Sequence, residues 1–302
     1  MRIGILSYYP ASKRSSMEEL RLVKAARELG HQARIIRVSR CQLVYDGDHP
    51  SVLHEGKAFP KFDVIIPRVS VLKNVELHTA ILKQFELMGI PVVNRSRPIN
   101  RAKNKLHTMQ VLNHHGIGVP KTIVLRSQKY LDWAIKQVGG FPVIMKTPFG
   151  SYGSGVVIAE SKRALASSLD ALWTAYEINI ALIQEYIKES KGRDIRLFVV
   201  GRKVVATMMR AASKGEFRSN IELGGAGEKI EVTPEEAENA IRATEVLGLE
   251  VSGVDLVRSN KGPLILEVNA NPGFKKLEEV TGRDVARAIV EYAVSKVVKE
   301  EK

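Results

Sequence analysis

The chain contains 302 residues, of which 44% are apolar and 26% are charged, so it has the composition of a globular protein and not of a disordered one. Lys and Arg number 46 against 33 Asp and Glu, and the resulting net charge of +13 favours anionic partners. The single cysteine, Cys41, excludes an intrachain disulfide and a cysteine-bound zinc ion, and no apolar run is long enough to cross a membrane. We therefore expect a cytoplasmic protein of about two domains, with Cys41 as a buried or half-buried residue and not a catalytic thiol.

The first part of the chain alternates strands and helices. Strands are predicted at 2–7, 32–38, 62–69 and 91–95, with helices between them at 15–31 and 77–90. Gly30 and Gly89 follow the last turns of the two helices, as is typical of a helix end. This alternation predicts an open α/β layer with a parallel sheet. The first strand is not followed by G-x-G-x-x-G, so the sheet need not bind a dinucleotide.

The rest of the chain has a different pattern. One helix with an apolar stripe is expected within 96–120. Further helices are predicted at 130–139, 161–173, 233–248 and 283–298, strands at 121–127, 142–148, 155–160 and 179–190, and hairpins at 194–210 and 251–273. Thr233, Pro234 and Glu236 occupy the N-cap, N1 and N3 positions of one of these helices. The pattern indicates an α+β region.

A glycine-rich loop lies between two of these strands. Residues 145–158 read MKTPFGSYGSGVVI, with glycines at 150, 153 and 155. The loop is neither a P-loop nor a Rossmann turn, because a strand and not a helix follows it. Its backbone N–H groups could close over a triphosphate, and Lys146 could reach phosphate oxygens. A plain flexible hairpin would explain the same residues.

A second set of polar residues lies in the hairpin at 251–273. Folding it about Lys261 places Asp255 opposite Glu267, and Asn269 shares a face of its strand with Glu267. Together they offer only hard oxygen donors, which suit Mg²⁺ or Mn²⁺ carrying nucleotide phosphates. The alternative is an ion pair of Glu267 with Arg258 or Lys261.

Several strings along the chain resemble the ATP-grasp superfamily, and within it the RimK-type α-L-glutamate ligases. They are KLHTMQVL, VIMKTPFGSYGSGVV, IQEYIKESKGRDIRLFVVG, GEFRSNIELGG, GVDLVRSNKGPLILEVNANPG and TGRDVA. The resemblance implies an ATP-grasp fold preceded by an N-terminal Rossmann-like parallel-sheet domain, an α/β and α+β protein. The implied division is 1–95 and 96–302, with a nucleotide-flap subdomain at about 120–184 and a metal and acceptor subdomain at about 185–302.

The resemblance also implies an ATP site. Lys105 and Lys146 correspond to the two lysines that bind ATP phosphates, and Gln184–Ile187 would meet the adenine edge through backbone groups, with Glu185 near a ribose hydroxyl. The implied ATP-binding residues are Lys105, Lys146, Gly150, Ser151, Tyr152, Gly153, Ser154, Gly155, Gln184, Glu185, Tyr186, Ile187, Asp194, Arg218, Ser219 and Asn220. Without the resemblance, Lys105 would be an ordinary solvated lysine and Asp194 a partner of Arg193 or Arg196.

Catalysis and metal binding follow from the same resemblance. Asp255, Glu267 and Asn269 match a set that holds two Mg²⁺ or Mn²⁺ ions, and Arg218 is the implied catalytic residue. A guanidinium suits the negative charge that develops on an acyl phosphate. Arg218 would hold the carboxylate oxygen in line with the γ-phosphate.

The implied function is ATP-dependent addition of L-glutamate to the C-terminal carboxylate of an acidic acceptor, through an acyl phosphate. A ribosomal protein C-terminus or poly-α-glutamate is the favoured acceptor. The alternatives are a cofactor tail (tetrahydromethanopterin or the deazaflavin coenzyme) and an amino-acid carrier protein. A homotetramer is implied by the resemblance, with no direct nucleic-acid or membrane partner. A basic ribosome- or RNA-binding module is the non-enzymatic alternative.

Overall fold

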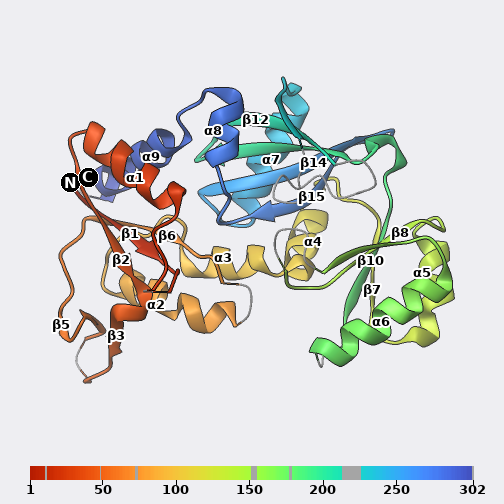
Figure 1. Cartoon of the computed structure of the whole chain (residues 1–302), viewed down its shortest axis with the longest axis horizontal. Coiled ribbons are helices and arrows are strands. Elements are labelled where there is room, and N and C mark those ends of the chain that lie inside the picture. Colours follow the sequence, from red (N-terminus) through yellow and green to blue (C-terminus); the bar gives the residue numbers. More distant parts are fainter. Residues whose placement is uncertain are drawn as a thin grey trace.

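The computed structural model describes residues 1–10, 12–47, 49–71, 74–150, 155–176, 179–212 and 226–300. These residues form four β-sheets, and Figure 1 shows the N-terminal sheet, the large central sheet and the outlying sheet of the middle segment arranged along the long axis. Within the described residues, no helix combines the length and apolar character needed to cross a membrane.

The N-terminal sheet is parallel, as predicted. Its strands β1 (Arg2–Ser7), β2 (Gln32–Arg37) and β6 (Val64–Arg68) pair in the order β2-β1-β6. Helices α1 (Met17–Glu28) and α2 (Val75–Leu87) connect to them. Ser16 and Glu19 form a capping box at the start of α1. Gly30 and Gly89 adopt positive φ just after the two helices, which confirms their predicted role.

Two features of this part differ from prediction. A separate antiparallel sheet of β3 (Cys41–Val44), β4 (Ser51–His54) and β5 (Lys57–Ala58), preceded by the short helix η1 (Val38–Arg40), was not predicted. The strand predicted at 91–95 is reduced to a single bridge between Ile65 and Val92. The side chain of Asn94 explains the second difference, because it hydrogen-bonds to the backbone of Val251 and Ala270 and so draws the chain out of the sheet.

Cys41 is partly buried at the start of β3, and its Sγ donates to the carbonyl of Arg37. Burial raises the pKa of its thiol to about 11. This environment disfavours a reactive thiolate and confirms the interpretation of Cys41 as a packing residue.

The single helix predicted within 96–120 is two helices, α3 (Ser96–Lys103) and α4 (Lys105–His114). Asn104 separates them in an extended conformation. Its side chain accepts hydrogen bonds from the backbone N–H groups of Leu106 and His107 and caps α4. The break places Lys105 in the first turn of α4.

The middle segment forms a four-stranded antiparallel sheet with its own core. Its elements are β7 (Thr122–Leu125), η2 (Gln128–Tyr130), α5 (Leu131–Gln137), β8 (Val143–Lys146), β9 (Val156–Ala159), α6 (Lys162–Tyr176), β10 (Ala181–Glu185) and η3 (Lys188–Ser190). The strand order is β7-β10-β8-β9. Leu131, Leu165 and Ile183 are buried between the helices and this sheet. All four predicted strands are therefore present, and β8 and β9 flank the glycine-rich loop.

The C-terminal segment supplies the five-stranded antiparallel sheet. Its elements are β11 (Arg193–Val200), β12 (Lys203–Ala211), β13 (Ala226–Lys229), α7 (Pro234–Val246), β14 (Val251–Ser259), β15 (Gly262–Asn269), α8 (Lys275–Thr281) and α9 (Val285–Glu300). The order is β13-β12-β11-β14-β15, so both predicted hairpins are confirmed. The predicted capping box of Thr233 and Glu236 begins α7. Helix α8 and strand β13 were not predicted.

Helix α9 returns to the N-terminal sheet, so the two ends of the chain lie close together in Figure 1. It packs against α1 and β6. Ile289 of α9 belongs to one buried cluster with Ile5, Leu22, Phe198 and Phe274. This shared core joins the N-terminal sheet to the five-stranded sheet.

Candidate active site

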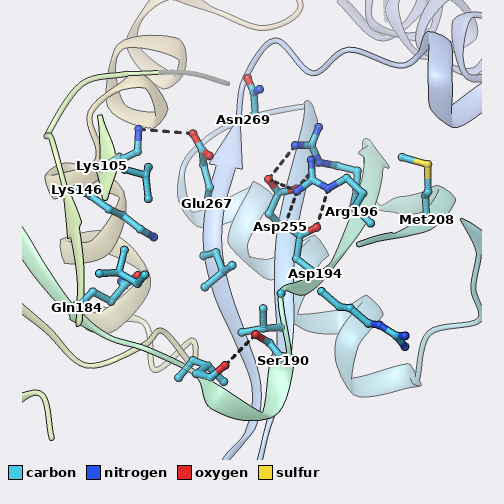
Figure 2. Close-up of a pocket in the computed structure, with 18 of the residues that line it drawn as sticks. Lys105, Lys146, Gln184, Ser190, Asp194, Arg196, Met208, Asp255, Glu267 and Asn269 are labelled. Atoms are coloured by element: carbon cyan, nitrogen blue, oxygen red, sulfur yellow. Dashed lines mark hydrogen bonds and ion pairs between the residues drawn. The ribbon is translucent and has the colours of Figure 1, made fainter. Parts of the chain in front are cut away.

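One pocket of about 400 Å³ lies between the four-stranded and the five-stranded sheets. Its walls come from β8 and β10 on one side and from β11, β12, β14 and β15 on the other, with α1 and α8 at one end. Figure 2 shows Lys105, Lys146 and Gln184 on one side of this pocket and Asp255 and Asp194 on the other. The two sheets of the α+β region therefore meet over a shared site.

The pocket has an apolar end. Ile187 and Val257 belong to one hydrophobic cluster, with Leu266 packed against it, and Ile144 and Val156 of the four-stranded sheet also line the pocket. Such a surface suits the faces of a flat base.

The adenine-side residues predicted from the sequence lie next to this apolar surface. Gln184 lies in β10 between two neighbouring strands, and its amide donates to Thr122 Oγ1 at 2.8 Å. Glu185 pairs with Lys261 Nζ at 3.0 Å and accepts from the backbone N–H of Lys121. Beyond the end of β10, the backbone of Tyr186 and Ile187 leaves the sheet. The carbonyl of Ile187 accepts hydrogen bonds from the backbone N–H and the Oγ of Ser190, at 3.2 and 2.8 Å.

The two lysines predicted to bind phosphates are brought together. Lys105 is buried, its Nζ donates to the carbonyl of Gly150 at 2.9 Å, and it lies 3.8 Å from Glu267 Oε1. The interpretation of Lys105 as a solvated surface lysine is therefore wrong. Lys146 ends β8 and lines the same pocket, where burial lowers its pKa to about 8. An anion placed between the two lysines would relieve the cost of burying positive charge.

The base of the glycine-rich loop is described, although its tip is not. Thr147 N–H donates to the carbonyl of Gly155 at 2.9 Å, and Thr147 Oγ1 donates to the carbonyl of Phe149. Gly155 has φ of +74°, and a Cβ there would collide with Thr147 Oγ1. Glycine is therefore required at this position on two grounds. The predicted residues Ser151, Tyr152, Gly153 and Ser154 lie outside the described residues, as do Arg218, Ser219 and Asn220.

The carboxylate hairpin folds as predicted. Asp255 of β14 lies directly opposite Glu267 of β15 in the register, and Asn269 lies two residues further along β15. All three line the pocket. The expected alternatives for Glu267 are wrong, because Arg258 pairs with Glu236 and Lys261 pairs with Glu185.

Two arginines that the prediction did not place in the site neutralise Asp255. Arg196 binds both of its carboxylate oxygens, and Arg210 lies 2.8 Å from Oδ2. Arg210 also forms a bidentate pair with Asp194, at 2.6 and 2.8 Å. Both arginines come from a neighbouring hairpin, so only the pairing of β11 with β14 brings them to Asp255.

This cluster is buried, and its charges depend on one another. Burial alone would raise the pKa of Asp255, but Arg196 and Arg210 outweigh it and lower the pKa. Burial opposes the charge of Arg210, yet Asp255 and Asp194 raise the pKa of its guanidinium. Removing one member would therefore leave an uncompensated buried charge.

The donor set at the hairpin fits a magnesium or manganese ion. Asp255, Glu267 and Asn269 offer only oxygen donors, and nucleotide phosphates held by Lys105 and Lys146 would complete the coordination shell. Within the described residues, no three His, Cys, Asp or Glu side chains gather around one point, so an ion here would depend on such phosphates. Three donors already occupy Asp255, and binding an ion would require it to exchange some of them.

Comparisons with known proteins cover the whole chain. The model of the RimK PreATP-grasp domain matches residues 1–99, and that of the RimK-like ATP-grasp domain matches residues 102–293. A probable α-L-glutamate ligase of Picosynechococcus is 44% identical over 292 residues, 97% of this chain and 95% of the relative. One from Methanococcoides burtonii is 43% identical over 293 residues, with the same coverage of both chains.

Solved structures share the fold at low identity. A RimK-domain ATP-grasp protein of Sphaerobacter thermophilus has a TM-score of 0.70 at 21% identity, over 97% of this chain and 100% of that one. The D-alanine–D-alanine ligase of Bacillus anthracis complexed with ATP has a TM-score of 0.70 at 18% identity, with both chains covered completely. The fold is therefore the ATP-grasp fold, as predicted.

Proposed function

Since the chain belongs to the RimK-like ATP-grasp family, and is therefore an ATP-dependent carboxylate–amine ligase, we propose that it adds L-glutamate to the C-terminal carboxylate of an acidic acceptor. The observation that carries this proposal is the opposition of Asp255 and Glu267 to Lys105 and Lys146 across one pocket. Relatives that match almost the full chain and are named probable α-L-glutamate ligases support glutamate as the amino acid.

In the proposed reaction, the acceptor carboxylate attacks the γ-phosphorus of ATP and forms an acyl phosphate and ADP. The amine of glutamate then attacks the acyl carbon, phosphate leaves, and the amine loses a proton as the amide forms. Lys105 and Lys146 would neutralise the phosphates, and Arg218 would hold the carboxylate oxygen in line. Two bound Mg²⁺ or Mn²⁺ ions, held by Asp255, Glu267 and Asn269, would supply further charge neutralisation.

The buried arginines extend this set of roles. Arg210 lies beside Asp255 on the wall where the γ-phosphate would approach. When an ion binds Asp255, the guanidinium groups of Arg196 and Arg210 would lose part of their compensation. They would then be available to the negative charge that develops on the transferring phosphoryl group.

For the acceptor, we favour a ribosomal protein C-terminus or poly-α-glutamate. A cofactor tail or an amino-acid carrier protein would use the same chemistry. The net charge of +13 suits ATP, glutamate and an acidic acceptor together. The proposed assembly is a homotetramer, which light scattering of the purified protein would test.

Mass spectrometry tests the proposed reaction. Purified protein is incubated with ATP, Mg²⁺ and glutamate, once alone and once with a peptide that ends in two glutamates. We expect products spaced by one glutamate residue and an equal yield of ADP. ATP binding without such products would contradict a peptide or polyglutamate acceptor. Binding of RNA without any dependence on ATP or Mg²⁺ would favour the basic-module alternative instead.

A further inference from the structure

The pocket continues beyond the residues that hold the phosphates. Strand β15 runs along it from Leu266 at the apolar end to Glu267 and Asn269, and the chain then enters α8 at Lys275. Lys275 and Lys276 line the pocket, together with Glu18 in the first turn of α1. We call Glu18, Lys275 and Lys276 the outer cluster. None of the roles described above uses them.

The charges of the outer cluster are only weakly compensated by the protein. Lys275 and Lys276 are 57% and 51% exposed, and they share one carboxylate, Glu279, at 4.0 and 3.4 Å. Ion pairs this exposed contribute little. The carboxylate of Glu18 makes no hydrogen bond or ion pair with any residue that the structure describes. It lies beside Gly273, where an added Cβ would be 3.6 Å from Oε1.

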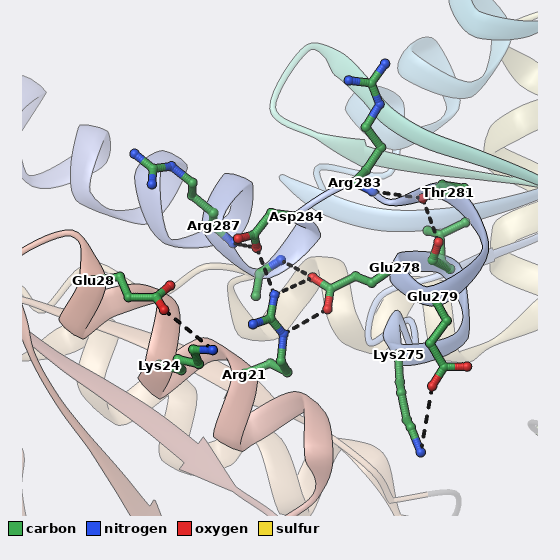
Figure 3. A network of polar contacts seen from close by, with 12 residues as sticks. Arg21, Lys24, Glu28, Lys275, Glu278, Glu279, Thr281, Arg283, Asp284 and Arg287 are labelled. Carbon is green, nitrogen blue, oxygen red and sulfur yellow. Dashed lines mark hydrogen bonds and ion pairs between the residues drawn. The ribbon is translucent and has the colours of Figure 1, made fainter.

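A network of ion pairs holds the two helices of the outer cluster together (Figure 3). Arg21 of α1 donates to Glu278 of α8 at 2.9 Å and to Asp284 at 3.2 Å. Glu278 also accepts from the backbone N–H of Ala286 at 3.0 Å. Arg21 follows Glu18 by three residues and Glu278 follows Lys275 by three, so each lies one helical turn from a member of the cluster.

The turn between β15 and α8 is held by the N-terminal sheet as well. Arg68 at the end of β6 donates to the carbonyl of Pro272 at 3.1 Å, and its guanidinium lies over the ring of Phe274. Asn271 donates to the carbonyl of Val69 at 3.0 Å. The outer cluster therefore rests on a rigid support, although its own charged groups are exposed to solvent.

We propose that the outer cluster binds the incoming L-glutamate, with Lys275 and Lys276 facing its two carboxylates and Glu18 facing its amino group. This inference rests on the proposed ligase activity and deepens it. The charges of the cluster that line the pocket, two ammonium groups and one carboxylate, are the inverse of those of glutamate, two carboxylates and one ammonium group. Glu279, which pairs with both lysines but does not line the pocket, would compete with the carboxylates of glutamate for them. Such complementarity orients a ligand and rejects one with a different charge pattern.

Because the outer cluster carries charges of both signs, it favours free glutamate over the acidic acceptor as its ligand. An acceptor whose C-terminus enters the pocket presents carboxylates there, and Glu18 would repel them. A free amino acid brings an ammonium group, which Glu18 would attract. The position also suits the chemistry, because the cluster lines the same pocket as Glu267 and Asn269, and α8 begins at Lys275, shortly after β15 ends at Asn269.

Steady-state kinetics of single variants test the proposal. Glu18→Gln, Lys275→Gln and Lys276→Gln each remove one charge while keeping the side-chain length similar. We expect KM for glutamate to rise about tenfold in each, since hydrogen bonds to charged groups contribute strongly, and KM for ATP to stay within twofold. Lys24→Gln is the matched control, because Lys24 lies on α1, pairs with Glu28 and does not line the pocket. It should change neither KM.

Amino-acid selectivity provides a second readout. The wild-type protein should have a higher kcat/KM for glutamate than for glutamine. One of the two lysines faces the side-chain carboxylate of glutamate, and its replacement, in Lys275→Gln or in Lys276→Gln, should reduce this preference. An unchanged ratio in both variants would contradict the assignment of the lysines. A rise in KM for the acceptor peptide, with KM for glutamate unchanged, would assign the outer cluster to the acceptor and overturn the proposal.

Arg21 is a positioning residue for the outer cluster, because its ion pair with Glu278 joins α1 to α8. Arg21→Gln should raise KM for glutamate several-fold, with kcat at saturating glutamate near that of the wild type, and Arg21→Lys should restore part of the loss. A fall in thermal stability with no change in KM for glutamate would make Arg21 merely structural. If the wild-type protein releases ADP with an amino acid other than glutamate, the proposed function itself fails. If the wild-type protein incorporates glutamate and the outer-cluster variants are unaffected, the outer cluster does not bind glutamate, while the ligase activity still stands.

Discussion

Two groups of charges along the same pocket differ in how they are compensated. Asp255 and Arg210 have side chains that are 8% exposed, and they neutralise each other together with Arg196 and Asp194. Lys275 and Lys276 are more than half exposed, and the protein compensates them only weakly. A buried charge must be paired within the protein, whereas an exposed charge is solvated by water and can pair with a ligand when one binds. The difference suggests that the buried cluster serves the phosphoryl chemistry and the outer cluster serves the choice of substrate.

The largest effect is expected from Asp255→Asn. Removing this charge leaves Arg196 without its bidentate partner and deprives Arg210 of one of its two, so the free energy of unfolding should fall by about 3–5 kcal/mol. Turnover should be lost as well. Denaturant unfolding and an ADP-release assay measure the two effects. A variant that is as stable as the wild type would show that Arg196 and Arg210 do not depend on Asp255 for compensation of their charge.

Glu267→Gln should separate chemistry from stability. Its side chain is 37% exposed and its ion pair with Lys105 is long at 3.8 Å, so the stability should change little. Turnover should fall about 10³-fold if Glu267 holds an ion that neutralises the phosphates. Titration of Mg²⁺ into wild-type and variant protein in the presence of ADP provides an independent readout. Full activity in this variant would refute the metal assignment.

Charge reversal at the outer cluster should change kinetics alone. Lys276→Glu should raise KM for glutamate by more than the neutral variant does, by about 30-fold, because repulsion replaces attraction. Added salt should raise KM for glutamate in the wild type, since exposed charges are screened within about 10 Å at 0.1 M ionic strength. The free energy of unfolding of Lys276→Glu should fall by no more than about 0.5 kcal/mol, because the new carboxylate repels Glu279 only weakly at this exposed site. A loss of stability similar to that of Asp255→Asn would remove the contrast between the two clusters.

The smallest effect is expected at an ion pair that has no part in the site. Burial opposes ionisation of Glu236, but hydrogen bonds from Arg258 and from the backbone of Thr233 outweigh it and lower the pKa of Glu236. Glu236→Gln should therefore cost about 1 kcal/mol at neutral pH. Because the pKa of Glu236 is lower in the folded state, its ionised carboxylate stabilises the folded protein at pH values above the unfolded pKa of about 4.3. This stabilisation is lost as the pH falls through the pKa of the folded state.

This variant serves as the structural reference for the others. The difference in stability between wild-type protein and Glu236→Gln should shrink as the pH is lowered below about 4. Values of kcat and KM should match those of the wild type. A change in KM for glutamate would mean that α7 influences the pocket.

Local patterns in the sequence were sufficient to predict most of the helices and strands. They also predicted the half of the site that lies on the hairpin of Asp255 and Glu267. Period-two alternation and a turn at Lys261 set the register that places Asp255 opposite Glu267. The capping box at Thr233 and the glycines after α1 and α2 were equally local. Short segments with weak patterns, such as β3 to β5 and α8, were not predicted, because they form regular secondary structure only through packing against the rest of the protein.

What the sequence determined by itself was the α/β and α+β order of elements, the family resemblance and the candidate ligands, since these depend on neighbours in the chain. Only the tertiary structure decided which charges meet. Arg196 and Arg210 reach Asp255 through the pairing of β11 with β14, and Arg21 joins Glu278 across 257 residues. Long-range electrostatic partners cannot be inferred from spacing, because charge interactions depend on distance and burial after folding and not on separation along the chain.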